Sequence, residues 1–141
     1  MSCLLGFDVG TRLIGVAVGN TLTANAQPVA VVKVRDGQPD WTSLDKLLQQ
    51  WRPNALVVGL PLTLDDGEQP ITRFARRFAA AIGERGRLPV HLQDERHSSQ
   101  EAARRFAHAR ASGTRRRRDA AMLDAMAAVV ILESWLAVNP E

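Results

Sequence analysis

The chain is poor in cysteine and in long apolar runs. Cys3 is its single cysteine, so no internal disulfide can form and nothing indicates an oxidising compartment. The longest apolar run, 125–132, is much shorter than the roughly 20 residues that cross a bilayer. The amino terminus also lacks the basic segment and long apolar run of a secretion signal. We therefore expect a cytoplasmic protein with no membrane partner.

No repeat, low-complexity tract or linker-like stretch divides the sequence. A hydrophobic fraction of 45% and a charged fraction of 23% are ordinary for a globular chain. A chain of 141 residues can bury roughly 70% of its unfolded surface around one core. We expect one domain that covers residues 1–141.

Basic side chains are concentrated in the second half of the chain. Residues 1–70 hold five basic and seven acidic side chains, a net charge of −2, whereas residues 71–141 hold thirteen and eight, a net charge of +5. Arginines gather between positions 104 and 118, which suits a polyanion such as nucleic acid. A solvated surface is the alternative, because sixteen of the eighteen basic residues are arginine, as codon bias also produces.

Apolar runs separated by turns predict three antiparallel strands at the start of the chain, over 3–9, 13–19 and 29–34. Helix and strand patterns then alternate. Helices are predicted from Asp40 or Thr42 to about Trp51, from Pro70 to Gly83 or Gly86, from Ser98 onward and from 119 to 138, and strands over 55–60 and 89–93. This alternation implies parallel pairing. We expect an α/β fold with a mixed five-stranded sheet, three antiparallel strands then two parallel, and helices on both faces.

Carboxylates occur where the sheet and its core are expected. Asp8 ends the first strand, Asp94 and Glu95 end the fifth, and Asp124 lies on an alanine-rich stripe of the last helix. A carboxylate that points at a sheet has to be paired, protonated or bound to a cation. An ion pair with an arginine for Asp124, or turn hydrogen bonds for Asp8, would explain each residue separately. A shared divalent cation explains them together.

The residue types in this group narrow the choice of metal. Carboxylate oxygens without histidine or cysteine partners favour Mg²⁺ or Mn²⁺ over zinc. His91, His97 and His108 lack metal-ligand spacing, so we expect them to be surface or core residues.

Five stretches of the sequence carry a resemblance that extends over nearly the whole chain. They are Phe-Asp-Val-Gly-Thr at 7–11, Ile-Gly-Val-Ala-Val at 14–18, Val-Val-Gly-Leu-Pro-Leu at 57–62, Asp-Glu-Arg at 94–96, and Asp124 followed by Ala-Ala-Val-Val-Ile-Leu-Glu at 127–133. Together they resemble the YqgF family, whose members are named by inference as pre-16S rRNA nucleases and earlier as Holliday junction resolvases. The resemblance implies an RNase H-like fold.

By this resemblance Asp8, Glu95 and Asp124 match the acidic catalytic residues that bind the metal. Strand alternation sends Asp94 and Glu95 to opposite faces, and we choose Glu95 as the ligand. Asn20 stands where many members have an acid, so a fourth ligand on the second strand is not expected. The implied reaction is two-metal hydrolysis of a phosphodiester by an endo- or exonuclease with Mg²⁺ or Mn²⁺ as cofactor.

Several positions are candidates for contact with nucleic acid: Thr11, Arg12, Arg96, Arg115, Arg116, Arg117 and Arg118. A solvated face is an equally good account of these arginines. Gly10, in the turn before them, would serve to provide a positive φ.

The function that the resemblance implies is 5′-end maturation of pre-16S ribosomal RNA in ribosome biogenesis, with RNA favoured over DNA. One alternative is a Holliday junction resolvase that cuts four-way DNA in recombination or repair, and another is a non-catalytic RNA-binding factor. An actin-like ATPase or sugar kinase is disfavoured by length, because those proteins close two such domains around a nucleotide. We expect a monomer or a weak homodimer.

Overall fold

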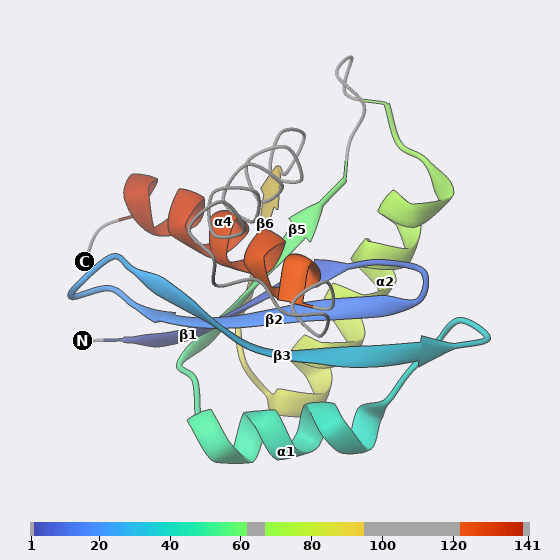
Figure 1. Cartoon of the computed structure of the whole chain (residues 1–141), viewed down its shortest axis with the longest axis horizontal. Helices are drawn as coiled ribbons and strands as arrows, with labels where there is room; N and C mark the ends of the chain where they lie inside the picture. Colours follow the sequence, from blue (N-terminus) through green and yellow to red (C-terminus); the bar gives the residue numbers. More distant parts are fainter. Residues whose placement is uncertain (1, 62–66, 95–121, 140–141) are drawn as a thin grey trace, which may run out of the picture.

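A mixed β-sheet with helices on both faces forms the molecule (Figure 1). The computed structural model describes residues 2–61, 67–94 and 122–139, and for 122–124 it describes the backbone alone. Within these ranges six strands lie in the order β4-β3-β2-β1-β5-β6. The strands are β1 (Cys3–Val9), β2 (Leu13–Asn20), β3 (Ala26–Arg35), β4 (Gln38–Pro39), β5 (Ala55–Leu60) and β6 (Val90–Asp94). The helices are α1 (Trp41–Trp51), α2 (Pro70–Gly86) and α4 (Met122–Val138).

The pairing of the strands confirms the predicted mixed sheet. β1 pairs antiparallel with β2, and β2 pairs antiparallel with β3. β5 lies parallel to β1 on its other side, and β6 lies parallel to β5. The helix predicted from Ser98 lies outside the described residues.

The expected number of five strands was wrong, because β4 adds a sixth. β4 is two residues long and pairs with the last residues of β3. The turn between them is Asp36-Gly37, and both residues have positive φ, 52° and 76°, as a tight hairpin turn requires. Two residues are too few to produce a periodic pattern, so the sequence carried no sign of this strand.

β3 is longer than predicted because Pro28 lies inside it and not at its start. The register with β2 shifts between Val16 and Ala17, and Pro28 pairs with Ala17 directly after this shift. A proline cannot donate to a strand ladder and is tolerated at such irregularities.

α1 begins at the first of the two caps that the sequence allowed. The carboxylate of Asp40 accepts hydrogen bonds from the Ser43 backbone N–H at 3.3 Å and from the Ser43 hydroxyl at 2.9 Å. These bonds, the side-chain one foremost, lower the pKa of Asp40, so the cap stays ionised. The helix ends at Trp51, and its C-cap, Arg52, has a left-handed φ of 45° directly before Pro53.

The main core lies between the sheet and the pair α1 and α2. Phe7 of β1 and Val58 of β5 point into it, and β5 is buried along its whole length, as its continuous apolar run predicted. Phe78 of α2 contacts the Phe7 ring edge-on at 5.4 Å and stacks with Trp41 of α1 at 5.8 Å. These rings join both helices to the centre of the sheet.

Of the described helices, α4 covers the opposite face, where it packs very close to β1 and β2 (Figure 1). A Cβ added at Gly6 would lie 2.9 Å from the Cβ of Leu132, and one added at Gly19 would lie 3.1 Å from a methyl of the same leucine. The Glu133 carboxylate also accepts a hydrogen bond from the Ala26 N–H at 3.1 Å. Because glycine leaves room for Leu132, the helix backbone can approach the strands.

None of the helices in the described ranges combines the length and the apolar composition that a membrane crossing needs.

Replacing Gly6 by alanine is expected to destabilise the protein by about 1–3 kcal/mol, because the new methyl overlaps Leu132 and both sides of the contact are packed. Urea unfolding followed by circular dichroism measures the change. The matched control is Gly37→Asn, at a positive-φ position where an added Cβ meets nothing within 4 Å; its cost should be smaller, since asparagine tolerates left-handed backbone. Equal costs for the two variants would contradict the close-packing account.

Candidate active site

Asp8 lies on the α4 face of the sheet. Neighbouring Phe7 and Val9 are buried in the core beneath α1 and α2, and side chains alternate along a strand, so Asp8 and Gly6 face the other way. Asp8 is half-buried, and its pairing partner on β2 is Gly15, which has no side chain to cover it. The carboxylate therefore stands at the carboxyl end of a central strand, next to a position on β2 that has no side chain.

The turn after Asp8 is held by backbone hydrogen bonds. The Gly10 N–H donates to the Leu13 carbonyl at 2.9 Å, and the Val34 N–H donates to the Arg12 carbonyl at 2.8 Å. Thr11 and Arg12 are exposed on this turn, as a role in contacting a ligand requires. The expectation of a positive φ at Gly10 was wrong, because Gly37 is the positive-φ glycine of the described residues. Gly10 is needed for space instead, since a Cβ there would lie 2.7 Å from the Leu13 carbonyl oxygen.

β1, β5 and β6 run parallel, so their carboxyl ends meet at the same edge of the sheet as Asp8. Phe7 pairs with Val58, and Val58 pairs with Leu92. Asp94 pairs with Leu60, which belongs to the core beneath α2. Paired residues share a face, so Asp94 lies on the α2 side and not on the side of Asp8.

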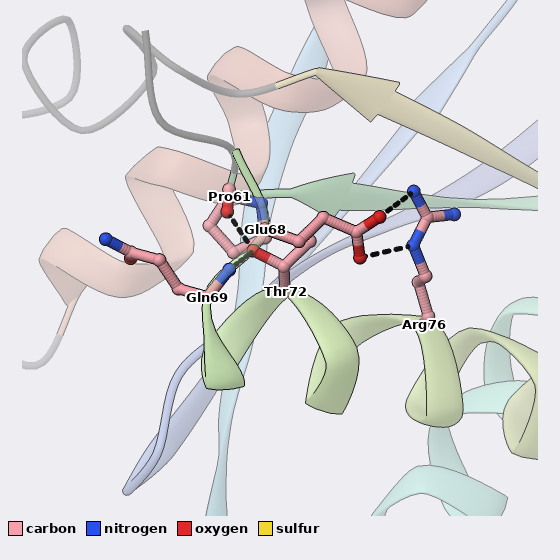
Figure 2. Close-up of polar contacts among 5 residues, drawn as sticks. All are labelled: Pro61, Glu68, Gln69, Thr72 and Arg76. Carbon is pink, nitrogen blue, oxygen red and sulfur yellow. Dashed lines mark hydrogen bonds and ion pairs between the residues drawn. The ribbon is translucent and has the colours of Figure 1, made fainter. Parts of the chain in front are cut away.

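The segment that leaves β5 at this edge is tied to the start of α2 (Figure 2). The fully buried Thr72 hydroxyl donates to the Pro61 carbonyl at 2.5 Å and accepts from the Gln69 N–H at 3.1 Å. Glu68 and Arg76 form a two-bonded ion pair at 3.0 and 3.2 Å on the surface nearby. The polar contacts of one side chain thus position the first turn of α2 against the end of β5.

α4 brings position 124 to the same region as Asp8. The Ala128 carbonyl lies 3.4 Å from the Cβ position built at Gly6, and Leu132 lies over the same glycine. Position 124 is one helical turn before Ala128, and Asp8 is one side-chain repeat after Gly6. The helix runs against the direction of β1 in Figure 1, so both steps lead to the same end of the sheet.

The other predicted site residues lie outside the described residues: Glu95, Arg96, Arg115, Arg116, Arg117 and Arg118. Of Asp124 only the backbone is described. Within the described ranges no three histidine, cysteine, aspartate or glutamate side chains come together as a metal site. Of the three acidic residues that the sequence suggested, Asp8, Glu95 and Asp124, the structure therefore describes Asp8 and the backbone of Asp124.

The surroundings of His91 and Cys3 also bear on the candidate site. The His91 ring stacks on Trp135 of α4 with ring centres 4.8 Å apart. Burial raises the pKa of the Cys3 thiol, so the neutral thiol is favoured over the nucleophilic thiolate.

Two basic residues escaped the sequence interpretation. Along β3, the exposed side chains of Lys33 and Arg35 alternate with those of Val32 and Val34, which are buried in the core beneath α1. The signal was present as the alternation Val-Lys-Val-Arg at 32–35. The net negative charge of residues 1–70 hides this local pattern when only total charges are compared.

Comparison with known proteins identifies relatives over almost the full chain. A family model described as RuvX, Holliday junction resolvase, matches residues 2–138. A protein of Xanthomonas axonopodis pv. citri (strain 306) is 60% identical over 134 residues, which cover 95% of this chain and 86% of its own length. Its name gives it as a pre-16S rRNA nuclease by inference.

Two solved structures share the fold. The T. thermophilus RuvC complex with a Holliday junction substrate has a TM-score of 0.61 at 16% identity, covering 97% of this chain and 95% of its own. The fowlpox virus resolvase complex with Holliday junction DNA has a TM-score of 0.60 at 12% identity, covering 99% of each chain. The predicted RNase H-like resolvase fold is confirmed.

Removing the Thr72 hydroxyl by Thr72→Val is expected to cost about 1–3 kcal/mol of stability, because the Pro61 carbonyl and the Gln69 N–H lose a buried partner. Thr72→Ser keeps the hydroxyl and should recover most of this loss. Urea unfolding of both variants provides the measurement. If Thr72→Ser and Thr72→Val destabilise the protein equally, the hydroxyl does not hold the start of α2 against the end of β5.

Proposed function

The chain belongs to the RuvX family, also called YqgF, and from this premise we propose that it is a metal-dependent nuclease that trims the 5′ end of pre-16S ribosomal RNA. The match to the family model over residues 2–138 supports the proposal, as does the name of the relative at 60% identity. Such a role places the protein in the cytoplasm. We further propose that residues 1–141 form one nuclease domain that acts as a monomer or weak homodimer.

The observation that carries the proposal is the position of Asp8. Its carboxylate stands on the α4 face, at the edge where three parallel strands end and where the first turn of α4 lies. We propose that Asp124 faces Asp8 across this gap. The step from Gly6 to Asp8 is about 7 Å along the strand, and one helical turn is about 5.4 Å, so the two steps are of similar length.

The third carboxylate is proposed from the alternation of β6. Asp94 faces the α2 side, as Leu60 beside it does, whereas His91 meets Trp135 of α4 on the other side. One more residue of the same alternation would direct Glu95 to the α4 face, toward Asp8. This supports Glu95 over Asp94 as the catalytic acid.

The proposed donor set fits a hard divalent cation. Asp8, Glu95 and Asp124 would offer carboxylate oxygens alone, the ligands that Mg²⁺ and Mn²⁺ prefer. When bound, the metal supplies activation of the attacking water and neutralisation of charge on the leaving oxygen.

The remaining work belongs to residues that hold the substrate. The exposed turn that carries Thr11 and Arg12 follows Asp8 directly, so both side chains are proposed to hold a phosphate next to the cleaved bond. Arg96 and the run 115–118 are proposed to contact the flanking backbone. Asp8 would position the water by accepting its hydrogen bond on the α4 face.

Asp8→Asn is expected to reduce cleavage of a 5′-extended 16S precursor RNA by more than about 100-fold, beyond what loss of an outer-shell partner costs a metal site. Glu95→Gln and Asp124→Asn should act in the same way. Manganese titration by calorimetry should show weaker binding for all three variants. Cleavage is followed by gel electrophoresis with Mg²⁺ and with Mn²⁺.

The control for these variants is Asp94→Asn, which removes an equal charge one residue away on the opposite face of the sheet. It should keep activity within a few-fold of the original protein. Loss of activity with Asp94→Asn and full activity with Glu95→Gln would reverse the assignment. Full activity and full complementation by Asp8→Asn in cells would leave a non-catalytic RNA-binding factor.

A Holliday junction resolvase is the second candidate, favoured by the description of the matching family model. The same carboxylates would then act on four-way DNA. Offering the protein precursor RNA and a four-way DNA junction in parallel separates the two candidates. Preference for the junction, together with obligate dimerisation, would select the resolvase.

A further inference from the structure

Three basic residues lie at the end of the sheet that also carries Asp8. Lys33 and Arg35 point to the face opposite the core of Val32 and Val34, which is the α4 face of Asp8. Arg12 follows Asp8 on the β1–β2 turn. In Figure 1 this turn and the β3–β4 hairpin extend toward the same side of the molecule.

Backbone contacts join the turn that carries Arg12 to β3. The Val34 N–H, between Lys33 and Arg35, donates to the Arg12 carbonyl at 2.8 Å. Lys33 itself pairs across β2 with Leu13, the residue after Arg12. The turn that leaves Asp8 is thus attached to β3 at the level of the two basic side chains.

A polar hollow of about 450 Å³ lies beside them. Its described lining consists of Lys33, Arg35, Gln38 and Asp40. The Asp40 carboxylate is engaged as the cap of α1 through Ser43, so it is directed to the helix start. Two cationic groups and an amide remain as hydrogen-bond donors, which suits an anion with several acceptor oxygens.

The spacing of these donors suits a chain of phosphates. Lys33 and Arg35 are two residues apart on one strand, so their Cα atoms are separated by about 7 Å, comparable to the step between successive phosphates. Ideal sheet spacing puts Lys33 roughly 12 Å from Asp8, across β2. A strand of nucleic acid bound at Asp8 can therefore pass over the turn and reach both residues.

We propose that Arg12, Lys33 and Arg35, here named the β3 strip, bind the phosphate backbone of the nucleic-acid substrate on one side of the cleaved bond. This assignment rests on the proposed nuclease function and deepens it. The strip gives the substrate a direction across the sheet, from the edge at β6 over β1 and β2 to the β3–β4 hairpin.

The test measures binding of a fluorescent precursor RNA by anisotropy at several salt concentrations, with EDTA present so that no cleavage occurs. Lys33→Gln/Arg35→Gln should weaken binding about tenfold and lower the slope of log affinity against log salt by about 1.4, the loss of two single-strand phosphate contacts. Lys33→Glu/Arg35→Glu should weaken it further. Thermal unfolding checks that the variants stay folded, since both side chains are exposed.

The matched control is Lys46→Gln/Arg52→Asn, which removes the same charge from exposed positions of α1 on the other face. Asparagine suits the left-handed backbone at position 52. This variant should keep both affinity and salt slope. Equal losses of RNA affinity in the two double variants would overturn the assignment of the strip, because the total charge of the protein would then explain the binding.

The outcomes separate this proposal from the proposed function. Cleavage by the original protein with unchanged affinity and slope for Lys33→Gln/Arg35→Gln overturns the strip alone. Absence of binding to any nucleic acid overturns both proposals. If Lys33→Gln/Arg35→Gln loses affinity for a four-way DNA junction, measured in parallel, but keeps its affinity for the precursor RNA, the strip is supported and its ligand is DNA.

Discussion

The close approach of α4 to the centre of the sheet is the contact on which the rest of the structure depends. Gly6 and Gly19 leave the space that Leu132 fills, and Glu133 ties the same helix to the start of β3. A helix held at this distance places its first turn at the carboxyl end of β1. The position of residue 124 relative to β1 therefore depends on the side-chain volumes at Gly6, Gly19 and Leu132.

The same packing sorts the acidic residues between the two faces. Phe7 has to enter the core beneath α2, so Asp8 faces α4; Leu60 enters that core as well, so Asp94 beside it faces α2. Burial of apolar neighbours thus sets the direction of carboxylates that contribute nothing to the core. A one-residue slip of either strand would exchange the faces and dismantle the proposed site.

The net charge of a long segment does not reveal where its basic side chains lie in the folded molecule. Residues 1–70 carry a net charge of −2, yet the turn after Asp8 and the end of β3 bring Arg12, Lys33 and Arg35 to one edge. Asp40, the acid in the described lining of the hollow, is hydrogen-bonded to Ser43 at the start of α1. The cap carboxylate and the two basic side chains therefore line one hollow, with the carboxylate hydrogen-bonded to the start of α1 and Lys33 and Arg35 exposed.

By itself the sequence determined the elements with a clear period: the β1–β2 hairpin, the buried run of β5 and the Pro70 start of α2. These patterns are local, because they arise from backbone geometry and from turn and cap residues within a few positions. The tertiary structure alone decided the two-residue β4, the Thr72 contact with Pro61, and the attachment of Arg12 beside Lys33. Each of these joins separate segments, and their meeting depends on strand order and on side-chain packing between elements, which no single stretch of sequence encodes.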